Sequence, residues 1–437
     1  MATAPLPLRR ALAPATGLAA ALALLAGGSA SAAEPIAQDA KVVPGEVVVR
    51  FDGESTGKRV ELPKGQTVED ATEALHKNPN VAEANANYVA TASQSPRPIY
   101  PNDPGPTGRV GGWALLQWNF LPENGVNAPQ AWANARAAGG SGGRGVKIAV
   151  LDTGVAYRTA GRFRRSPDLA SSKFLSGYDY VDRDSRPYDE NGHGTHVAST
   201  IAEQINNGVG LTGLAYAARI MPIRVLDADG AGDAVDISRA IRNAGRKKVD
   251  IINLSLEFDS AVQAHHIPDV LSAIRYARKK GAIVVAAAGN EGVSSIAYPS
   301  RAPGVISVGS TTEHKCQSEF SNEGSGLDLV APGGGADSVI LSDPNCRSDE
   351  VGRDIFQLTF TSSVRNFGYP SDYEGTSMAA PHVAATAALV LSSKTLGPNP
   401  NAKQVERHLK RTAQDLGRTG YDTRYGWGMV DAAAATR

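Results

Sequence analysis

Three residues of this chain could together carry out nucleophilic catalysis. Ser377 is the second residue of "TSMAAPHVAATAALV", just before an apolar run. Its hydroxyl is either a nucleophile or an ordinary helix N-cap. His193 lies between two glycines in "NGHGTHVAST", and Asp152 ends the strand-like segment "VKIAVLD". A serine nucleophile needs a base to take its proton and an acid to orient that base. The chain contains each of these groups.

Each candidate also has a structural explanation. Asp152 could cap the turn that follows its strand. Asn290, at the end of "AIVVAAAGN", could cap a turn or donate a hydrogen bond to developing negative charge. His196, one turn after His193, is interpreted as structural. Asp152, His193, Asn290 and Ser377 all lie where a loop meets a strand or helix of one predicted sheet. A shared catalytic role explains this arrangement better than several unrelated caps.

The elements that must position these residues alternate between two patterns. Strands are expected at 146–152, 219–227, 249–256, 282–290, 305–310 and 327–333, and helices at 194–204, 234–248 and 269–280. This alternation predicts an α/β fold, a three-layer sandwich with a mostly parallel sheet. Functional residues in such sheets collect at the carboxyl ends of the strands.

The composition and the N-terminal segment limit the possible functions. The 437 residues contain 44 Lys plus Arg and 44 Asp plus Glu, so net charge gives no argument for a nucleic-acid partner. Residues 1–33 combine a basic pair, an apolar stretch and small residues at 30–32, which predicts a secretory signal peptide rather than a membrane anchor. We therefore expect a secreted protein, extracellular or periplasmic. In an exported chain Cys316 and Cys346 are expected to form a disulfide, the alternative being two reactive thiols.

A small unit precedes the main pattern. Residues 41–51 and 81–92 are strand-like, and 67–78 have helical spacing with an acidic first turn. Residues 93–112 and 135–145 are rich in Pro, Gly or Ser and are interpreted as linkers. The segment "GGSGG" fits a hydrolase nucleophile elbow only by chance, because no strand precedes it.

Four segments in order, "VLDTGV", "NGHGTHVAS", "AAAGNEG" and "GTSMAAPHVA", resemble the signature segments of subtilisin-like serine proteases. The resemblance implies a serine endopeptidase that works through an acyl-enzyme intermediate. Ser377 would be the nucleophile, His193 the general base and then acid, and Asp152 the group that orients the imidazole. Asn290 and the Ser377 N–H would form the oxyanion hole.

The resemblance also implies how substrate is bound and how the chain is divided. The implied substrate-binding residues are Gly230, Ala231, Gly232, Asn253, Leu254, Ser255, Leu256 and Ala297. Glu257 and Phe258 stand where the family usually has glycines, so the sequence predicts no preferred side chain. The domains would be a signal peptide (1–33), a small α+β inhibitory propeptide (34–98) and the catalytic domain (99–437). The propeptide would act as intramolecular inhibitor and chaperone, the alternative being an accessory domain kept in the mature enzyme.

The implied metal is calcium. Its ligands would be Asp103, Asp168, Asn207 and the carbonyl groups of Ile205, Val209 and Leu211. Such oxygen ligands suit Ca²⁺, although Asn207-Gly208 could also form a plain turn. Residues 333–374 form an insertion, either a specificity loop or a surface hairpin held by the disulfide.

The expected partners are protein or peptide substrates, with no nucleic acid and no membrane anchor, and the chain is expected to be a monomer. A different class of function is a catalytically silent relative that only binds peptides. The sequence argues against it, because all four catalytic positions hold the required residue types.

Overall fold

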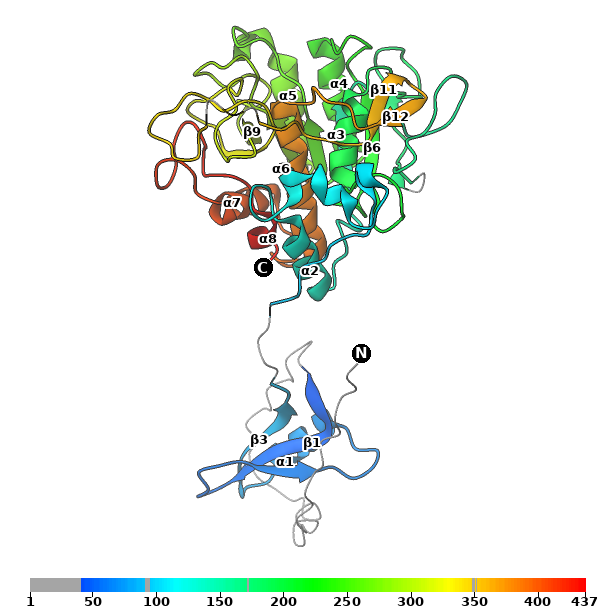
Figure 1. The fold of residues 1–437 in the computed structure, drawn as a ribbon. Helices are drawn as coiled ribbons and strands as arrows, with labels where there is room; N and C mark the ends of the chain where they lie inside the picture. Colours follow the sequence, from blue (N-terminus) through cyan, green and yellow to red (C-terminus); the bar gives the residue numbers. More distant parts are fainter. Residues whose placement is uncertain (1–40, 91–94, 171–172, 348–349, 351) are drawn as a thin grey trace. The chain divides into compact units, whose positions relative to one another are not determined.

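The computed structural model describes residues 41–90, 95–170, 173–347, 350 and 352–437. The predicted signal peptide lies outside these residues. The chain divides into two compact units, which meet in sequence between Gln94 and Ser95 (Figure 1). In the part of the chain that the structure describes, no helix is both long and apolar enough to cross a membrane.

The first unit is a three-stranded antiparallel sheet, in the order β2-β1-β3, with one helix. Its elements are β1 (Val42–Phe51), β2 (Lys58–Glu61), α1 (Val68–His76) and β3 (Val81–Tyr88). Helix α1 begins after Thr67, whose hydroxyl accepts the Asp70 N–H at 3.1 Å. Val47, Val49 and Leu75 are in its small core. Both predicted strands and the helix are present, and β2 was missed.

The second unit is built on a seven-stranded sheet in the order β10-β9-β8-β7-β4-β6-β5, in which all neighbours are parallel. Its strands are β4 (Lys147–Asp152), β5 (Tyr178–Asp179), β6 (Arg219–Arg224), β7 (Ile251–Leu254), β8 (Ile283–Ala287), β9 (Val305–Thr311) and β10 (Leu329–Pro332). The six predicted strands are all present, and the mostly parallel α/β sheet is confirmed. The two-residue strand β5 was not predicted.

Helices cover both faces of this sheet, because successive side chains of a strand point to opposite faces. Ile148 and Val150 of β4 pack with α3 and α6, whereas Ala149 and Leu151 pack with α4 and α5. The helices are α2 (Ala128–Ala137), α3 (His193–Ala202), α4 (Ala234–Arg246), α5 (Pro268–Lys279), α6 (Thr376–Ser393), α7 (Ala402–Thr412) and α8 (Ala432–Ala435). The short 3-10 helices are η1 (Gly105–Thr107), η2 (Gly112–Leu115), η3 (Trp118–Phe120) and η5 (Ala264–His266). Helix α6, orange in Figure 1, runs through the centre of the unit.

The two stretches interpreted as linkers are largely ordered parts of the second unit. The Ile99 N–H donates to the Pro129 carbonyl at 2.9 Å, and Trp113 Nε1 donates to the Pro101 carbonyl at 2.9 Å. The second stretch begins inside α2. The linker interpretation was wrong here because contacts with distant residues, which composition does not reveal, hold these segments.

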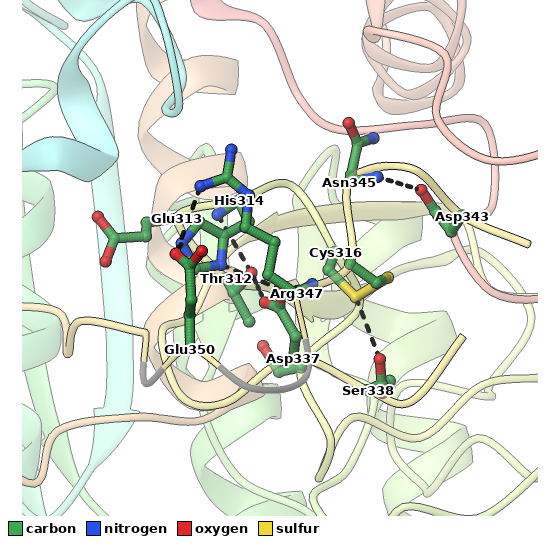
Figure 2. Close-up of polar contacts among 12 residues, drawn as sticks. Thr312, Glu313, His314, Cys316, Asp337, Ser338, Asp343, Asn345, Arg347 and Glu350 are labelled. Atoms are coloured by element: carbon green, nitrogen blue, oxygen red, sulfur yellow. Dashed lines mark hydrogen bonds and ion pairs between the residues drawn. A yellow bond between two sulfur atoms is a disulfide. The ribbon is translucent and has the colours of Figure 1, made fainter. Parts of the chain in front are cut away.

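The insertion is held at two places. Near its start, the Cys316–Cys346 disulfide is present as predicted, and Asp337 accepts hydrogen bonds from Thr312 Oγ1 and the Arg347 N–H (Figure 2). Further on, the insertion forms the hairpin of β11 (Thr359–Ser363) and β12 (Asn366–Gly368). The hairpin lies beyond the disulfide-closed loop and packs on α3, so the disulfide does not itself close it.

The disulfide gives a stability prediction. Replacing both cysteines by serine opens a connection between positions 30 residues apart. By the loop-entropy model, the free energy of unfolding should fall by about 3 kcal/mol. The measurement is the urea midpoint of the double variant against the parent chain, with and without dithiothreitol. An unchanged midpoint would mean that the Asp337 hydrogen bonds alone hold the loop.

Candidate active site

Strand β4 delivers a carboxylate to the carboxyl edge of the sheet. Asp152 is its last residue and is fully buried, since β6 and β7 flank the strand. Its Oδ1 lies 2.7 Å from His193 Nδ1 and accepts the Thr153 N–H at 2.8 Å. Oδ2 is buried and has no hydrogen-bond partner. The His193 ring is therefore the group that compensates this charge.

His193 is the first residue of α3 and reaches Asp152 only because a glycine follows it. A Cβ on Gly194 would lie 2.1 Å from the Gly154 carbonyl oxygen and 3.0 Å from Asp152 Oδ1. Any larger residue would push the helix away from β4. The glycine is thus required by close approach of helix and strand.

A second buried aspartate holds the start of α3 in place, and the sequence analysis missed it. Asp189 accepts hydrogen bonds from the hydroxyls of Thr153, at 2.9 Å, and Thr195, at 2.6 Å. It also accepts the N–H groups of Asn191, Gly192 and Thr195. Burial raises the pKa of Asp189, although these hydrogen bonds oppose the shift. An aspartate just before a predicted helix start is a cap signal that could have identified it.

The half-buried His193 differs from the fully buried His196 and His382 in its ability to carry a proton. Burial alone would lower the pKa of His193, but the Asp152 carboxylate outweighs it, and the net shift is upward. Burial lowers the pKa of His196 to about 3 and that of His382 to about 4. His196 Nε2 lies 2.8 Å from the Ile355 carbonyl oxygen, in agreement with the structural role expected for it.

Asn290 and Ser377 meet where β8 ends and α6 begins. Asn290 Oδ1 accepts the Thr376 N–H at 2.7 Å and the Thr376 hydroxyl at 2.9 Å, which orients the amide. Ser377 is the second residue of α6, so its N–H has no acceptor within the helix. Gly375 is the N-cap of α6, and no side chain caps the helix. The interpretation of Ser377 as a helix N-cap was therefore wrong. The Ser377 hydroxyl instead donates to the Ser255 carbonyl at 3.2 Å.

A cavity of about 430 Å³ contains both His193 and Ser377. Of the implied substrate-binding residues, those that line it are Gly230, Ala231, Gly232, Ser255 and Leu256. Asn253 and Leu254 are buried in β7, and Ala297 is buried with its N–H on the Ala288 carbonyl, so none of these three lines it. A larger cavity of about 840 Å³, formed mainly by residues 340–345 and 414–425, contains none of the predicted site residues.

Three of the implied calcium ligands, Asp103, Asp168 and Asn207, lie together at a separate place. Asp103 accepts the N–H groups of Asn206 and Asn207, at 2.8 and 3.1 Å, and Asn207 Nδ2 lies 2.6 Å from Asp168 Oδ1. Asp168 Oδ2 is buried without a partner. Burial and then the Asp103 charge raise the pKa of Asp168 to about 7, against the Asn207 hydrogen bond.

These residues fit a hard cation, because an unpartnered buried carboxylate oxygen faces a loop rich in carbonyl groups. The loop from Ile205 to Leu211 contains the three implied carbonyl ligands, at Ile205, Val209 and Leu211. No three His, Cys, Asp or Glu side chains cluster as a metal site in the described ranges. A cation here would depend on amide and carbonyl oxygens in addition to the two carboxylates.

The comparisons with known proteins agree with this geometry. Residues 143–428 match the model of the subtilase family. The chain is 33% identical to the thermophilic serine proteinase of Bacillus sp. (strain AK1), over 86% of this chain and 78% of that protein. It is 39% identical to subtilisin BL of Lederbergia lenta, over 68% and 92%. A solved protease structure from Pseudoalteromonas arctica PAMC 21717 matches with a TM-score of 0.61 at 32% identity, covering 77% of this chain and 99% of that one.

The Asp152–His193 contact predicts a change in pKa. In Asp152→Asn, the charge and hydrogen bond of Asp152 are lost and only the smaller effect of Asp189 opposes burial, so the pKa of His193 should fall below the parent value. The measurement is NMR titration of ¹⁵N-labelled histidines from about pH 5 to about pH 9. His196 and His382 serve as internal controls that stay neutral. An unchanged His193 pKa would show that Asp152 does not stabilise the imidazolium.

Proposed function

The chain belongs to the subtilase family of serine proteases, and on this premise we propose that Asp152, His193 and Ser377 are its catalytic triad. The observation that carries the proposal is the 2.7 Å contact of His193 with buried Asp152, in a cavity that Ser377 also lines. The reaction would be hydrolysis of internal peptide bonds in protein or peptide substrates, through an acyl-enzyme intermediate.

In the first step the Ser377 hydroxyl turns from the Ser255 carbonyl toward His193, Oγ attacks the scissile carbonyl carbon, and His193 takes the hydroxyl proton. Asp152 stabilises the imidazolium that forms. His193 then gives the proton to the leaving amine, and water repeats the sequence on the acyl-enzyme. The raised pKa of His193 suits this exchange, because Asp152 makes the ring a stronger base for the hydroxyl proton.

The oxyanion would be stabilised by Asn290 Nδ2 and the Ser377 N–H. Two hydrogen bonds to Asn290 Oδ1 leave the amide nitrogen as the donor that faces away from α6. The Ser377 N–H is free of helical hydrogen bonds. Donors that are fixed before the reaction stabilise charge at no cost of reorganisation.

An extended substrate would lie along the backbone of 230–232 and 255–256, which line the catalytic cavity from two different loops. Main-chain pairing of this kind gives affinity and leaves selectivity to side-chain pockets. Asn253, Leu254 and Ala297 would then act from behind the cavity wall, through the position of that backbone.

We further propose that the enzyme is secreted as a zymogen, with a signal peptide at 1–33, an inhibitory propeptide at 34–98 and a catalytic domain at 99–437. The first unit supports this, because it is compact and has its own small core. It would act as inhibitor and folding aid, and the mature enzyme as a monomer without nucleic-acid partner or membrane anchor.

Replacing Ser377 by alanine tests both the triad and the zymogen. Wild type should lose the segment before about residue 101 by its own action, whereas Ser377→Ala should keep it and lose at least about 10³-fold in kcat/KM on a peptide substrate. Mass spectrometry and initial rates are the measurements, with Ser371→Ala in the insertion as control. Activity that survives in Ser377→Ala would contradict the triad. Processing that persists there would assign the trimming to another protease.

We also propose a structural calcium ion held by Asp103, Asp168, Asn207 and the carbonyl groups of Ile205, Val209 and Leu211. Bound calcium would compensate the two carboxylates and fix the loop that follows α3. It takes no part in peptide hydrolysis in this proposal.

The calcium proposal predicts a metal-dependent stability. At about 100 times its dissociation constant, calcium should stabilise the Ser377→Ala chain by about 2.7 kcal/mol relative to EDTA. Asp168→Asn should abolish most of this difference, while Asp269→Asn at the exposed start of α5 should keep it. Calorimetric Tm values give the comparison. If calcium raises the Tm of Asp168→Asn as much as that of Asp269→Asn, the ion binds elsewhere.

A further inference from the structure

Glu257 places a carboxyl group at the catalytic cavity. It follows Leu256 shortly after the end of β7 and lines the same cavity as His193 and Ser377. Among the described residues that line this cavity, Glu257 is the one carboxylate, and none is a lysine or arginine. A bound substrate would therefore meet a negatively charged side chain, that of Glu257.

The side chain reaches across to the end of β8. Glu257 Oε1 accepts a long hydrogen bond from Asn290 Nδ2, at 3.5 Å. Oε2 lies so close to Gly289 that a Cβ there would come within 2.7 Å of it. The carboxyl is thus beside the amide that we propose as oxyanion donor.

This position fixes which substrate residue it would meet. The oxygen of the scissile carbonyl would lie at Asn290, and the residue that supplies this carbonyl is the one on the N-terminal side of the scissile bond. Its side chain branches from the carbon next to that carbonyl. The side chain would therefore enter the space beside Glu257.

The two oxygens of Glu257 have different surroundings, and Oε1 is the one at the exposed contact with Asn290. Oε2 is buried and has no hydrogen-bond partner, which is costly for a carboxylate. The neighbouring Glu291 differs, because its Oε1 accepts the Ser260 N–H at 2.9 Å and its Oε2 accepts Asn322 Nδ2 at 3.0 Å. Glu291 adds negative potential, and Glu257 is the carboxyl that lines the cavity.

We propose that Glu257 selects substrates with lysine or arginine on the N-terminal side of the scissile bond, by pairing its carboxylate with the substrate's cation. Because Oε1 accepts only a long hydrogen bond from Asn290, a charge-assisted hydrogen bond from the substrate cation to this oxygen compensates the carboxylate. A neutral side chain leaves it unpaired, and an acidic one is repelled. The inference rests on the proposed function, because a selectivity residue acts only if Ser377 cleaves peptide bonds.

The test uses tetrapeptide p-nitroanilides of one sequence that differ only in the last residue, which is lysine, arginine, norleucine or glutamate. Norleucine is apolar and close to lysine in length. Wild type should favour lysine over norleucine in kcat/KM, and Glu257→Gln should reduce that ratio by about 10- to 100-fold. Asp259→Asn, an exposed carboxyl two residues away, is the matched control and should keep the ratio.

The pH dependence of the ratio is a second readout. Burial first, and then the charge of Glu291, raise the pKa of Glu257 to about 7, while its hydrogen bonds with Asn290 oppose the shift. The group is ionised above this pKa, so the lysine preference of wild type should grow from about pH 5.5 to about pH 8.5. His193, which titrates in the same cavity, changes the rate on lysine and norleucine alike and cancels in the ratio. The ratio in Glu257→Gln should stay flat.

Two outcomes would overturn the inference. An unchanged lysine-to-norleucine ratio in Glu257→Gln would remove its role in selectivity. An equal loss on all four substrates would make Glu257 a residue that positions Asn290. If wild type cleaves none of the peptides and matches Ser377→Ala, the proposed function itself fails. If wild type cleaves and Ser377→Ala does not, only the selectivity claim is at stake.

Discussion

Asp152 is fully buried at the end of a central strand, and a carboxylate in that position is unfavourable unless a partner compensates its charge. The compensation comes from His193 at 2.7 Å and from the Thr153 N–H. To bring the imidazole there, α3 must begin against the end of β4. The glycine after His193 permits this approach, and Asp189 ties the helix start to Thr153. The active-site geometry around the histidine follows from this one buried charge.

The serine side of the cavity depends on α6. Nearly all of its 18 residues are buried, so the helix is held by contacts around its whole circumference rather than along one stripe. It packs on β7, β8, β9 and β10, whose carboxyl ends lie at the same sheet edge. Its N-terminus therefore meets Asn290, and the Ser255 hydroxyl donates to the Ser377 carbonyl at 2.7 Å. Small alanines allow this close packing and leave little freedom in where Ser377 lies.

The same physics explains what could be predicted from sequence. Strands buried on both faces are continuous apolar runs, so β4 and β6 to β10 were recognisable, and their parallel order put Asp152 and Asn290 at one edge. Other features depend on partners far along the chain. Asp103 is buried by residues near position 206, and Ile99, in a segment whose composition resembles a linker, is held by the Pro129 carbonyl. Strand β5 is too short to show an alternating pattern. Four of the five donors of Asp189 are nearby in sequence, but its hydrogen bond with Thr153 exists only in the folded chain.

Glu257 shows how a single departure can link selectivity to catalysis. An ionised carboxyl next to Asn290 is close to the place where negative charge develops in the transition state, and like charges there raise its energy. A substrate cation that pairs with Glu257 removes this repulsion as well as adding an attraction. Both contributions favour the same substrates, and the first acts mainly in the transition state, so it would appear in kcat as well as in KM. Where the family usually has a glycine, this position supplies no such charge.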